Sequence, residues 1–389
     1  MTSEADATLA DRPLLSGERP TQPPSPPMLA PPSASRGGMA VLPTIDDGAR
    51  RVNPEKARYE SKRMIGEGAF GEVELAMDND IDRPVAIKRV RQDMVSADNI
   101  ARFVSEVQVV GRLEHPGIVP IHDVGLDDSG YFFVMKYIDG ETLESVIAKL
   151  RKKDPAYTKK FTMEHRTQLF LQLCRAVQFA HARGIIHLDI KPANVMVGHF
   201  GEVVLMDWGL AKRVGAAPTI GTPAVGMVCG TPMYMSPEQA RGENDRTDER
   251  SDVYALCALF WELLALDHYL PIKPDVDALL LAVCNEAPMR PIPMHHKYAV
   301  PPDLAWLIAP GLEKNPAQRY QTVGDLCVRI QQAIEGQAPV QCPCTGLKRA
   351  GGVWSDFIDN HPLGALAIAA LTGVFAIVGV ASTLWSIVS

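Results

Sequence analysis

The chain has 389 residues, of which 46% are hydrophobic and 22% are charged, and its formal net charge is -7 at pH 7. This composition is that of a globular protein with a core, and it excludes a chain that is disordered throughout. Without a basic excess, the chain also lacks the charge of a protein that binds nucleic acid through its phosphates. The cysteines, seven in all, favour reduced thiols over a disulfide framework because they are odd in number.

Residues 1–56 are rich in Pro, Ser and Ala, with proline runs at 23–27 and 31–32 and no sustained apolar period. Such a segment cannot bury enough apolar surface to fold, so we expect it to be disordered. A polyproline ligand for a partner protein is the alternative. No basic start followed by an apolar run is present, so a secretory signal is not expected.

Residues 57–335 form the next predicted unit. The spacing of apolar residues differs between its two parts. In the first part, up to about residue 150, short β-like runs alternate with turns and with one helix-like stretch; the runs are 71–76, 84–90 and 131–137, and the stretch is 100–113. From residue 162 onward a helical period dominates, with Gly184 as the stop of one long helix. The sequence therefore predicts an α+β fold with a small β-rich lobe and a larger helical lobe.

The last part of the chain differs in composition from the rest. Residues 336–361 are predicted to be a linker, and from 362 to the end no charged residue occurs. An apolar run of this length exceeds the roughly 20 residues that cross a bilayer, so 362–388 predicts one transmembrane helix. A buried core helix is the alternative, but core helices usually carry a polar face.

A glycine-rich segment lies between two strand-like runs. Gly66, Gly68 and Gly71 have GxGxxG spacing, and glycines let the backbone approach phosphate groups without a clash. Alone, the pattern is weak, because a tight hairpin or a dinucleotide-binding turn has the same spacing. The dinucleotide-binding turn requires a helix directly after the third glycine, whereas 72–76 continues as a strand.

Two further charged residues follow in an order that fits nucleotide binding. Lys88 ends the apolar run 85–88 and is placed to reach the α and β phosphates of a nucleotide. Glu106, in the helix-like stretch, is the candidate partner that holds this lysine forward. A lone strand lysine is usually only solvated, so the pair needs support from elsewhere in the chain.

The most specific pattern in the chain runs from His187 to Asn194 and reads HLDIKPAN. An HxDxKxxN pattern is expected by chance at roughly one position in a million. It is followed by Asp207-Trp208-Gly209, which ends another strand-like run.

Together these motifs resemble those of the Hanks-type protein kinases. The amino acids within them are similar to those of the bacterial serine/threonine branch of that family. The resemblance covers about residues 59 to 332, in family order and with family spacing. It implies a bilobal protein-kinase fold for 57–335, ATP and Mg²⁺ as cofactors with Mn²⁺ as the other candidate ion, and Ser/Thr hydroxyls of proteins as acceptors. It also implies autophosphorylation between two copies of the chain.

The resemblance assigns expected roles to residues of three kinds. Asp189 would accept the proton of the acceptor hydroxyl, Lys191 would offset phosphoryl charge, and Lys88 with Glu106 completes the catalytic set. Metal-binding roles fall to Asn194 and Asp207. The residues expected to contact the nucleotide are Ile65, Gly66, Glu67, Gly68, Ala69, Phe70, Gly71, Glu72, Val73, Ala86, Lys88, Met135 and Tyr137.

Other matches and departures lie in the helical lobe. Glu238 is expected to be a buried partner of Arg319, Asp252 to brace the catalytic loop, and Thr231 to hydrogen-bond beside Asp189. The chain departs from the family pattern in having Leu188 where arginine is usual, and likewise Trp208 for phenylalanine and Ser236 for alanine. Since that arginine normally receives a phosphorylated activation-loop residue, the sequence leaves open whether phosphorylation of Thr219 or Thr222 regulates activity.

Two other functions compete with an active protein kinase. A pseudokinase scaffold is disfavoured because Lys88, Asp189, Asn194 and Asp207 are all present. A small-molecule kinase should lack the segment 231–238 and Arg319. We therefore expect a serine/threonine protein kinase in the cell membrane, with a single span and a cytoplasmic kinase domain.

Overall fold

The computed structural model describes residues 56–67, 71–215, 225–287, 300–337 and 343–361, residue 339, and a few residues between 364 and 372. The predicted disordered segment lies outside these residues except for Lys56. Most of the predicted transmembrane helix lies outside them too. Within the described part of the chain, no helix is both long and apolar enough to span a bilayer.

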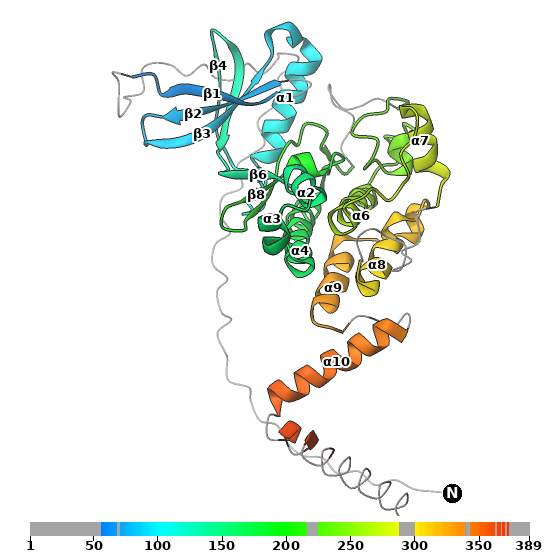
Figure 1. The fold of residues 1–389 in the computed structure, drawn as a ribbon. Helices are drawn as coiled ribbons and strands as arrows, with labels where there is room; N and C mark the ends of the chain where they lie inside the picture. Colours follow the sequence, from blue (N-terminus) through cyan, green and yellow to red (C-terminus); the bar gives the residue numbers. More distant parts are fainter. Residues whose placement is uncertain are drawn as a thin grey trace, which may run out of the picture. The chain divides into compact units, whose positions relative to one another are not determined.

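The first lobe is an antiparallel sheet with strand order β1-β2-β3-β5-β4 (Figure 1). Its strands are β1 (Tyr59–Glu67), β2 (Gly71–Asp78), β3 (Arg83–Val90), β4 (Ile121–Asp127) and β5 (Gly130–Lys136). The three runs predicted as strands are therefore confirmed as β2, β3 and β5. The predicted helix is α1 (Ala97–Val110), which begins at the N-cap Ser96 and packs Phe103 against Phe133 of β5.

The second lobe is mainly helical, as the sequence predicts. Its helices are α2 (Leu143–Arg151), α3 (Pro155–Lys160), α4 (Met163–His181), α5 (Pro237–Ala240), α6 (Glu249–Ala265), α7 (Val276–Asn285), α8 (Pro302–Ile308) and α9 (Val323–Ile334). Short strands and 3₁₀ turns lie between them: β6 (Gly140–Thr142), β7 (Ile185–Ile186), η2 (Pro192–Asn194), β8 (Val195–Gly198), β9 (Val203–Leu205), β10 (Lys212–Arg213), η3 (Ala309–Leu312) and η4 (Pro316–Gln318). A further 3₁₀ turn, η1 (Gln92–Met94), precedes α1.

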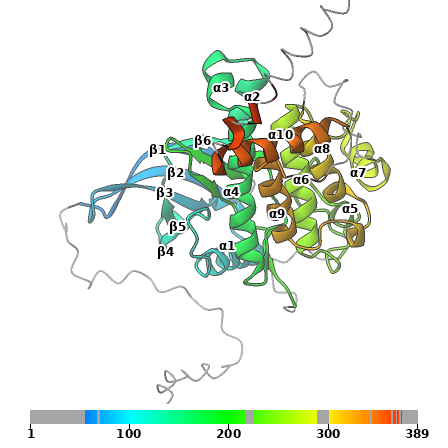
Figure 2. The same ribbon diagram turned by 90° about the horizontal axis from the view of Figure 1, so that it is seen from below.

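The core of the helical lobe lies between α4, α6 and α9, and α4 lies beside α9 in Figure 2. Helix α4 follows the N-cap Thr162, whose side chain caps its first turn, and buries an apolar face with helical spacing. Phe170 of α4 stacks on Phe260 of α6, with ring centroids 3.9 Å apart. Nearly all of α6 is buried, and the C-cap residue Leu266 that follows it has a left-handed conformation. The packing of these helices therefore holds the loops on their surface in position.

The segment expected to be a linker, 336–361, contains a helix, α10 (Pro343–Asn360). The prediction of a linker did not include this helix. It overlooked apolar residues at 353, 354, 357 and 358, whose spacing places them on one side of a helix.

Candidate active site

The glycine-rich segment forms the turn between β1 and β2. Gly66 pairs with Val73 and Glu67 with Glu72, so the strands run antiparallel on both sides of the turn. Gly71 has a clear reason to be glycine, because a Cβ there would lie 2.5 Å from the carbonyl oxygen of Arg89. Since a strand rather than a helix follows Gly71, the dinucleotide-binding alternative is wrong.

Of the residues predicted to contact the nucleotide in this turn, Gly68, Ala69 and Phe70 lie outside the described residues. Ile65 is partly exposed, and Glu67 pairs with Arg91 at 2.7 Å. The other predicted nucleotide contacts lie on neighbouring strands or, for Tyr137, directly after β5. Ala86 of β3 is buried and pairs across the sheet with Met135 of β5, while Val73 and Tyr137 are half-buried.

Lys88 joins three elements at the centre of the site. Its Nζ donates to both carboxylate oxygens of Glu106 in α1, at 2.7 and 3.0 Å, and to Oδ1 of Asp207 at 3.0 Å. The contact between Lys88 and Glu106 that the sequence predicts is thus present. Asp207 follows β9 in the other lobe, so the lysine links the two lobes.

In this cluster, burial and the neighbouring charges shift pKa values in opposite directions. It would lower the pKa of Lys88, but the carboxylates of Glu106 and Asp207 outweigh it and raise that pKa above its ordinary value. Partial desolvation by the surrounding protein would likewise raise the pKa of Asp207, whose side chain stays half exposed, yet Lys88 holds that pKa below its ordinary value. Lys88 is therefore a cation and Asp207 an anion at neutral pH. This cation is placed to meet phosphate groups, and this anion to meet a metal ion.

Asp189 lies in the loop between β7 and η2, and three side chains bind its carboxylate. Oδ2 accepts hydrogen bonds from Lys191 Nζ at 2.7 Å and from Asn194 Nδ2 at 3.2 Å. Oδ1 accepts one from the Thr231 hydroxyl at 3.3 Å, and Lys191 Nζ also donates to that hydroxyl at 2.9 Å. The predicted contact of Thr231 is present. The carboxylate is held in one orientation with a cation beside it.

Asp252 of α6 fixes the backbone of the same loop. It is fully buried, and its carboxylate accepts hydrogen bonds from the amides of His187 and Leu188, both at 2.8 Å. His181 at the end of α4 bonds to it as well, at 2.8 Å. Burial would raise the pKa of Asp252, but these partners keep it below its ordinary value. The bracing role expected for Asp252 agrees with these contacts.

The loop also carries a buried histidine whose tautomer follows from its contacts. His187 Nδ1 accepts a hydrogen bond from the amide of Asp189 at 3.2 Å, so the proton must lie on Nε2. Nε2 then donates to the carbonyl oxygen of Met206 at 3.2 Å. The ring packs on Trp208, with centroids 4.5 Å apart. This neutral histidine ties the loop of Asp189 to the segment of Asp207.

Asn194 and Asp207 are the two predicted metal ligands. The amide nitrogen of Asn194 donates to the main-chain oxygen of Asp189 at 2.9 Å, which leaves the amide oxygen as the group available to a cation. Asp207 offers carboxylate oxygens and is 48% exposed. Among the described residues, no three His, Cys, Asp or Glu side chains form a metal site by themselves. The donor set therefore fits Mg²⁺, which is commonly held by one or two protein oxygens together with phosphates.

Leu188 has a positive φ of 64°, which is rare for a residue with a branched side chain. Its neighbours impose this conformation. The amide is bound by Asp252, and the carbonyl oxygen accepts a hydrogen bond from Gln239 Nε2 at 2.7 Å. This role of Gln239 was not predicted, because no local pattern in the sequence indicates a partner 51 positions away.

The predicted pair of Glu238 and Arg319 is present and buried. Two hydrogen bonds of 2.8 Å join the guanidinium to the carboxylate. Ser251 donates to the same carboxylate at 2.7 Å, and Arg319 donates to the main-chain oxygens of Glu313 and Arg250. Because the neighbour of Glu238 is Gln239, the pair anchors the helix that holds Leu188.

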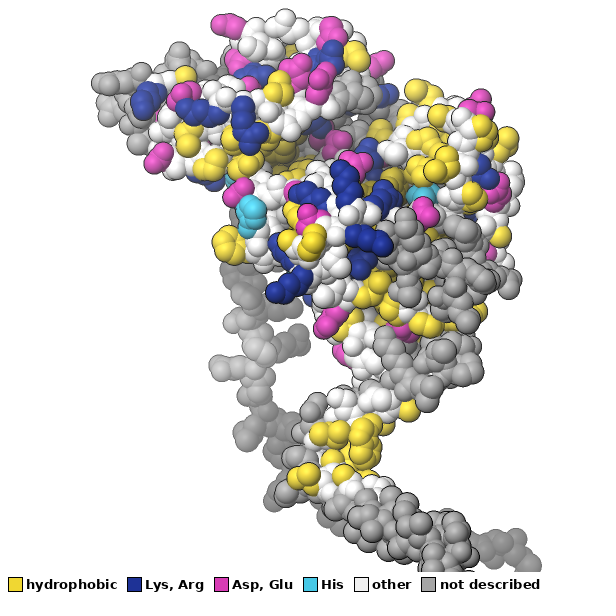
Figure 3. Space-filling model, in the orientation of Figure 1, with side chains coloured by type: hydrophobic (Ala, Val, Ile, Leu, Met, Phe, Trp, Pro, Cys, Tyr) yellow, Lys and Arg dark blue, Asp and Glu magenta, His cyan; other side chains and the backbone are white. Residues whose placement is uncertain are grey.

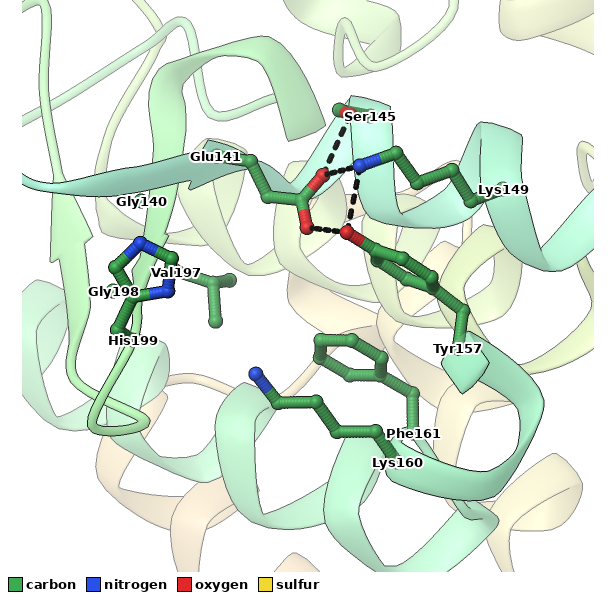
Figure 4. A pocket seen from close by; sticks show the side chains of 10 residues that line it. All are labelled: Gly140, Glu141, Ser145, Lys149, Tyr157, Lys160, Phe161, Val197, Gly198 and His199. Carbon is green, nitrogen blue, oxygen red and sulfur yellow. Dashed lines mark hydrogen bonds and ion pairs between the residues drawn. The ribbon is translucent and has the colours of Figure 1, made fainter. Parts of the chain in front are cut away.

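A pocket of about 290 Å³ lies between β6, α2, α3 and β8, away from the residues described above (Figure 4). Glu141 at its wall accepts hydrogen bonds from Ser145, Lys149 and Tyr157. None of the predicted site residues lines it. Basic side chains gather over α2 and α3 in Figure 3; those of this segment are Lys149, Arg151, Lys152, Lys153, Lys159 and Lys160.

Comparison with known proteins agrees with this geometry. The profile of the family described as "Protein kinase domain" matches residues 59–332. A probable serine/threonine-protein kinase of Streptomyces coelicolor, SCO3848, is 34% identical over 318 residues, which cover 79% of this chain and 44% of that protein. Serine/threonine-protein kinase PknD of Chlamydia caviae is 32% identical over 298 residues, covering 72% of this chain and 31% of its own length.

The chain thus spans less than half the length of these curated relatives. The matched range includes every predicted site residue, from the glycine-rich turn to Arg319. The fold, the ordered motifs and the matches lead to one assignment: the chain belongs to the Hanks-type protein kinases, in their bacterial serine/threonine branch.

Proposed function

We propose that this chain transfers the γ-phosphoryl group of ATP to serine and threonine hydroxyls of proteins. The observation that carries the proposal is the arrangement around Asp189, whose carboxylate is bound by Lys191, Asn194 and Thr231. A hydroxyl that approaches this carboxylate meets a proton acceptor with a cation 2.7 Å away. A protein kinase needs this pairing at the point of transfer.

Each residue then has one task in the proposed reaction. Asp189 orients the acceptor hydroxyl and takes its proton as the new O–P bond forms and the bond to the leaving ADP oxygen breaks. Lys191 offsets negative charge on the group in transfer. Lys88 binds the nucleotide phosphates, and Glu106 keeps it in place. Most of the catalysis comes from positioning and charge compensation, since the protein forms no covalent intermediate.

The nucleotide and metal sites are proposed on the same residues. Ala86, Val73, Met135 and Tyr137 border the adenine, and the glycine-rich turn covers the phosphates. Asn194 and Asp207 hold Mg²⁺, with Mn²⁺ as a substitute. When bound, the metal ion neutralises charge on the β and γ phosphates.

The direct experiment uses purified full-length chain, labelled ATP and a generic acceptor protein. We expect label to appear in the acceptor and in the chain itself when Mg²⁺ is present, and to be lost when EDTA is added. Restoring Mg²⁺ or adding Mn²⁺ should restore the transfer. Binding of ATP without any transfer under these conditions would instead establish a pseudokinase.

Regulation by activation-segment phosphorylation is expected to be weak. Thr219 and Thr222 lie outside the described residues, but the docking point of a phosphate on the catalytic loop is Leu188, which offers no cation. A Thr219→Ala, Thr222→Ala double variant should therefore keep most of its activity toward a generic substrate. A loss of about a hundredfold, equivalent to roughly 2.7 kcal/mol, would show that another cation takes this role. Lys212 and Arg213 are the nearest candidates in sequence.

We also propose that residues 362–388 anchor the chain in the cell membrane as a single span, with the kinase domain in the cytoplasm. The proposal is supported by the absence of charge in this sequence and by its length. Lys348 and Arg349 supply basic charge on its N-terminal side. An anchor of this kind also raises the local concentration of the chain, which favours phosphorylation of one copy by another.

Alkaline extraction of membranes tests the anchor. The full chain should stay in the membrane pellet, whereas a chain ending at residue 361 should be released, because only a spanning segment resists this treatment. The truncation removes none of α1 to α10. Release of the full chain along with the truncated one would rule out the span.

A further inference from the structure

Helix α10 exposes large apolar side chains. Val353 is 60% exposed, Trp354 45% and Ile358 41%. Phe357 is half-buried and stacks on Trp354, with ring centroids 5.6 Å apart. Because positions 353, 354, 357 and 358 lie on one side of a helix, these four side chains form a continuous surface, the apolar stripe of α10. An exposed stripe of this kind normally marks an interaction surface.

The polar residues of α10 are placed differently. Ser355 is exposed and lies on the side of the helix opposite the stripe. Arg349 is also exposed and lies one turn before Val353, at the border of the stripe. A long cationic side chain at such a border can reach the phosphates of lipid headgroups while the neighbouring apolar groups are buried. The helix is thus amphipathic, with a cation at the edge of its apolar side.

The helical hydrogen bonds of α10 continue to His361, whose amide donates to the carbonyl oxygen of Phe357 at 2.8 Å. The helix ends at Asn360, and Pro362 cannot donate the main-chain hydrogen bond that a continuing helix needs. A further helical turn follows, since the amide of Ala365 donates to the carbonyl oxygen of His361 at 2.9 Å. Two helical segments meeting at a proline can differ in direction, so one can lie along a surface that the other crosses.

We propose that α10 lies in the headgroup region of the membrane, with its apolar stripe inserted among the lipids. This inference rests on the proposed membrane anchor, which begins two residues after α10 ends and so holds the helix at the bilayer surface. Tryptophan and phenylalanine are the side chains that favour this region, since the rings are apolar and the indole N–H can bond to headgroups. The membrane surface covers the stripe, and the kinase domain is held close to the bilayer.

The test uses full-length chain in vesicles made with or without lipid brominated near the headgroup end of its acyl chains. Bromine quenches tryptophan fluorescence only at close range. The signal of Trp354 is obtained by subtracting the fluorescence of a Trp354→Phe variant from that of the unchanged chain. Trp306 provides a matched control, because it is also 45% exposed but lies on α8, a kinase-domain helix that contacts α10, so quenching confined to Trp354 shows insertion of the stripe itself. Its signal comes from a Trp306→Phe variant in the same way.

We expect brominated lipid to remove most of the Trp354 signal and to leave the Trp306 signal unchanged. Equal Trp354 signals in both kinds of vesicle would overturn the inference, and a blue-shifted but unquenched signal would mean that the stripe packs on protein. If the full chain fails to enter the vesicles, the anchor itself is wrong. If it enters and Trp354 is not quenched, the anchor stands and only the placement of α10 fails.

Discussion

Replacing Asp189 with asparagine is expected to lower the rate of phosphoryl transfer by about 10³-fold, because the amide cannot accept the proton of the acceptor hydroxyl. The side chain keeps its size, and its amide oxygen can still accept the hydrogen bonds of Lys191 and Asn194, although the amide nitrogen cannot accept the one from Thr231. ATP affinity should stay nearly the same, since Lys88 and the strands of the other lobe supply the proposed nucleotide contacts. Single-turnover transfer and a nucleotide titration measure the two effects separately.

A matched control is the same substitution at Asp128, an exposed carboxylate in the turn between β4 and β5. Asp128→Asn should leave transfer and binding unchanged. If Asp189→Asn transfers phosphate as fast as the unchanged chain, Asp189 is not the proton acceptor. A large loss of ATP affinity would mean instead that Asp189 serves mainly to bind the nucleotide.

Replacing Arg319 with methionine is expected to lower the free energy of unfolding by about 3–5 kcal/mol, because it leaves the Glu238 carboxylate buried without its partner. Glu238 is 2% exposed and Arg319 4%, so water cannot compensate for the missing cation. Burial would raise the pKa of Glu238, and Arg319 is the main group that holds it below its ordinary value. Denaturant unfolding, followed by the fluorescence of the buried tryptophans, measures the loss.

The control for this prediction is Arg241→Met, which removes a pair with Glu243 at 2.9 Å on the surface. Exposed pairs contribute about 0–1 kcal/mol, so this variant should unfold almost like the unchanged chain. Similar losses for Arg241→Met and Arg319→Met would mean that burial of the Glu238–Arg319 pair has no special role. The phosphoryl-transfer activity of Arg319→Met gives a second readout. Its loss is expected because Gln239, next to Glu238, holds the carbonyl of Leu188 in the catalytic loop.

Much of the site could be predicted from the sequence because its residues lie in short motifs with fixed spacing. The contacts of Lys88 with Glu106 and of Thr231 with Asp189 are examples, since each partner belongs to a motif that is recognisable by itself. The strands and helices with a clear period were predicted for the same reason. The roles assigned to these residues remain predictions until variants are measured.

Contacts between segments without a motif could not be predicted. Gln239 reaches the carbonyl of Leu188, and His181 reaches Asp252, only because the packing of α4, α5 and α6 brings them together. Helix α10 was missed for another reason. Its glycines lower the helical propensity of the segment and mask the spacing of Val353, Trp354 and Phe357. The spacing of these apolar residues, which the linker prediction did not use, agrees with the helix that the structure shows.

The most direct measurement is the identity of the phosphorylated amino acids after the full chain has reacted with labelled ATP and Mg²⁺. The pairing of Asp189 with Lys191 and Thr231 predicts label on phosphoserine or phosphothreonine, both in the chain and in an acceptor protein. The Asp189→Asn variant should show almost none. Label on phosphotyrosine alone, or no label while ATP is bound, would contradict the account.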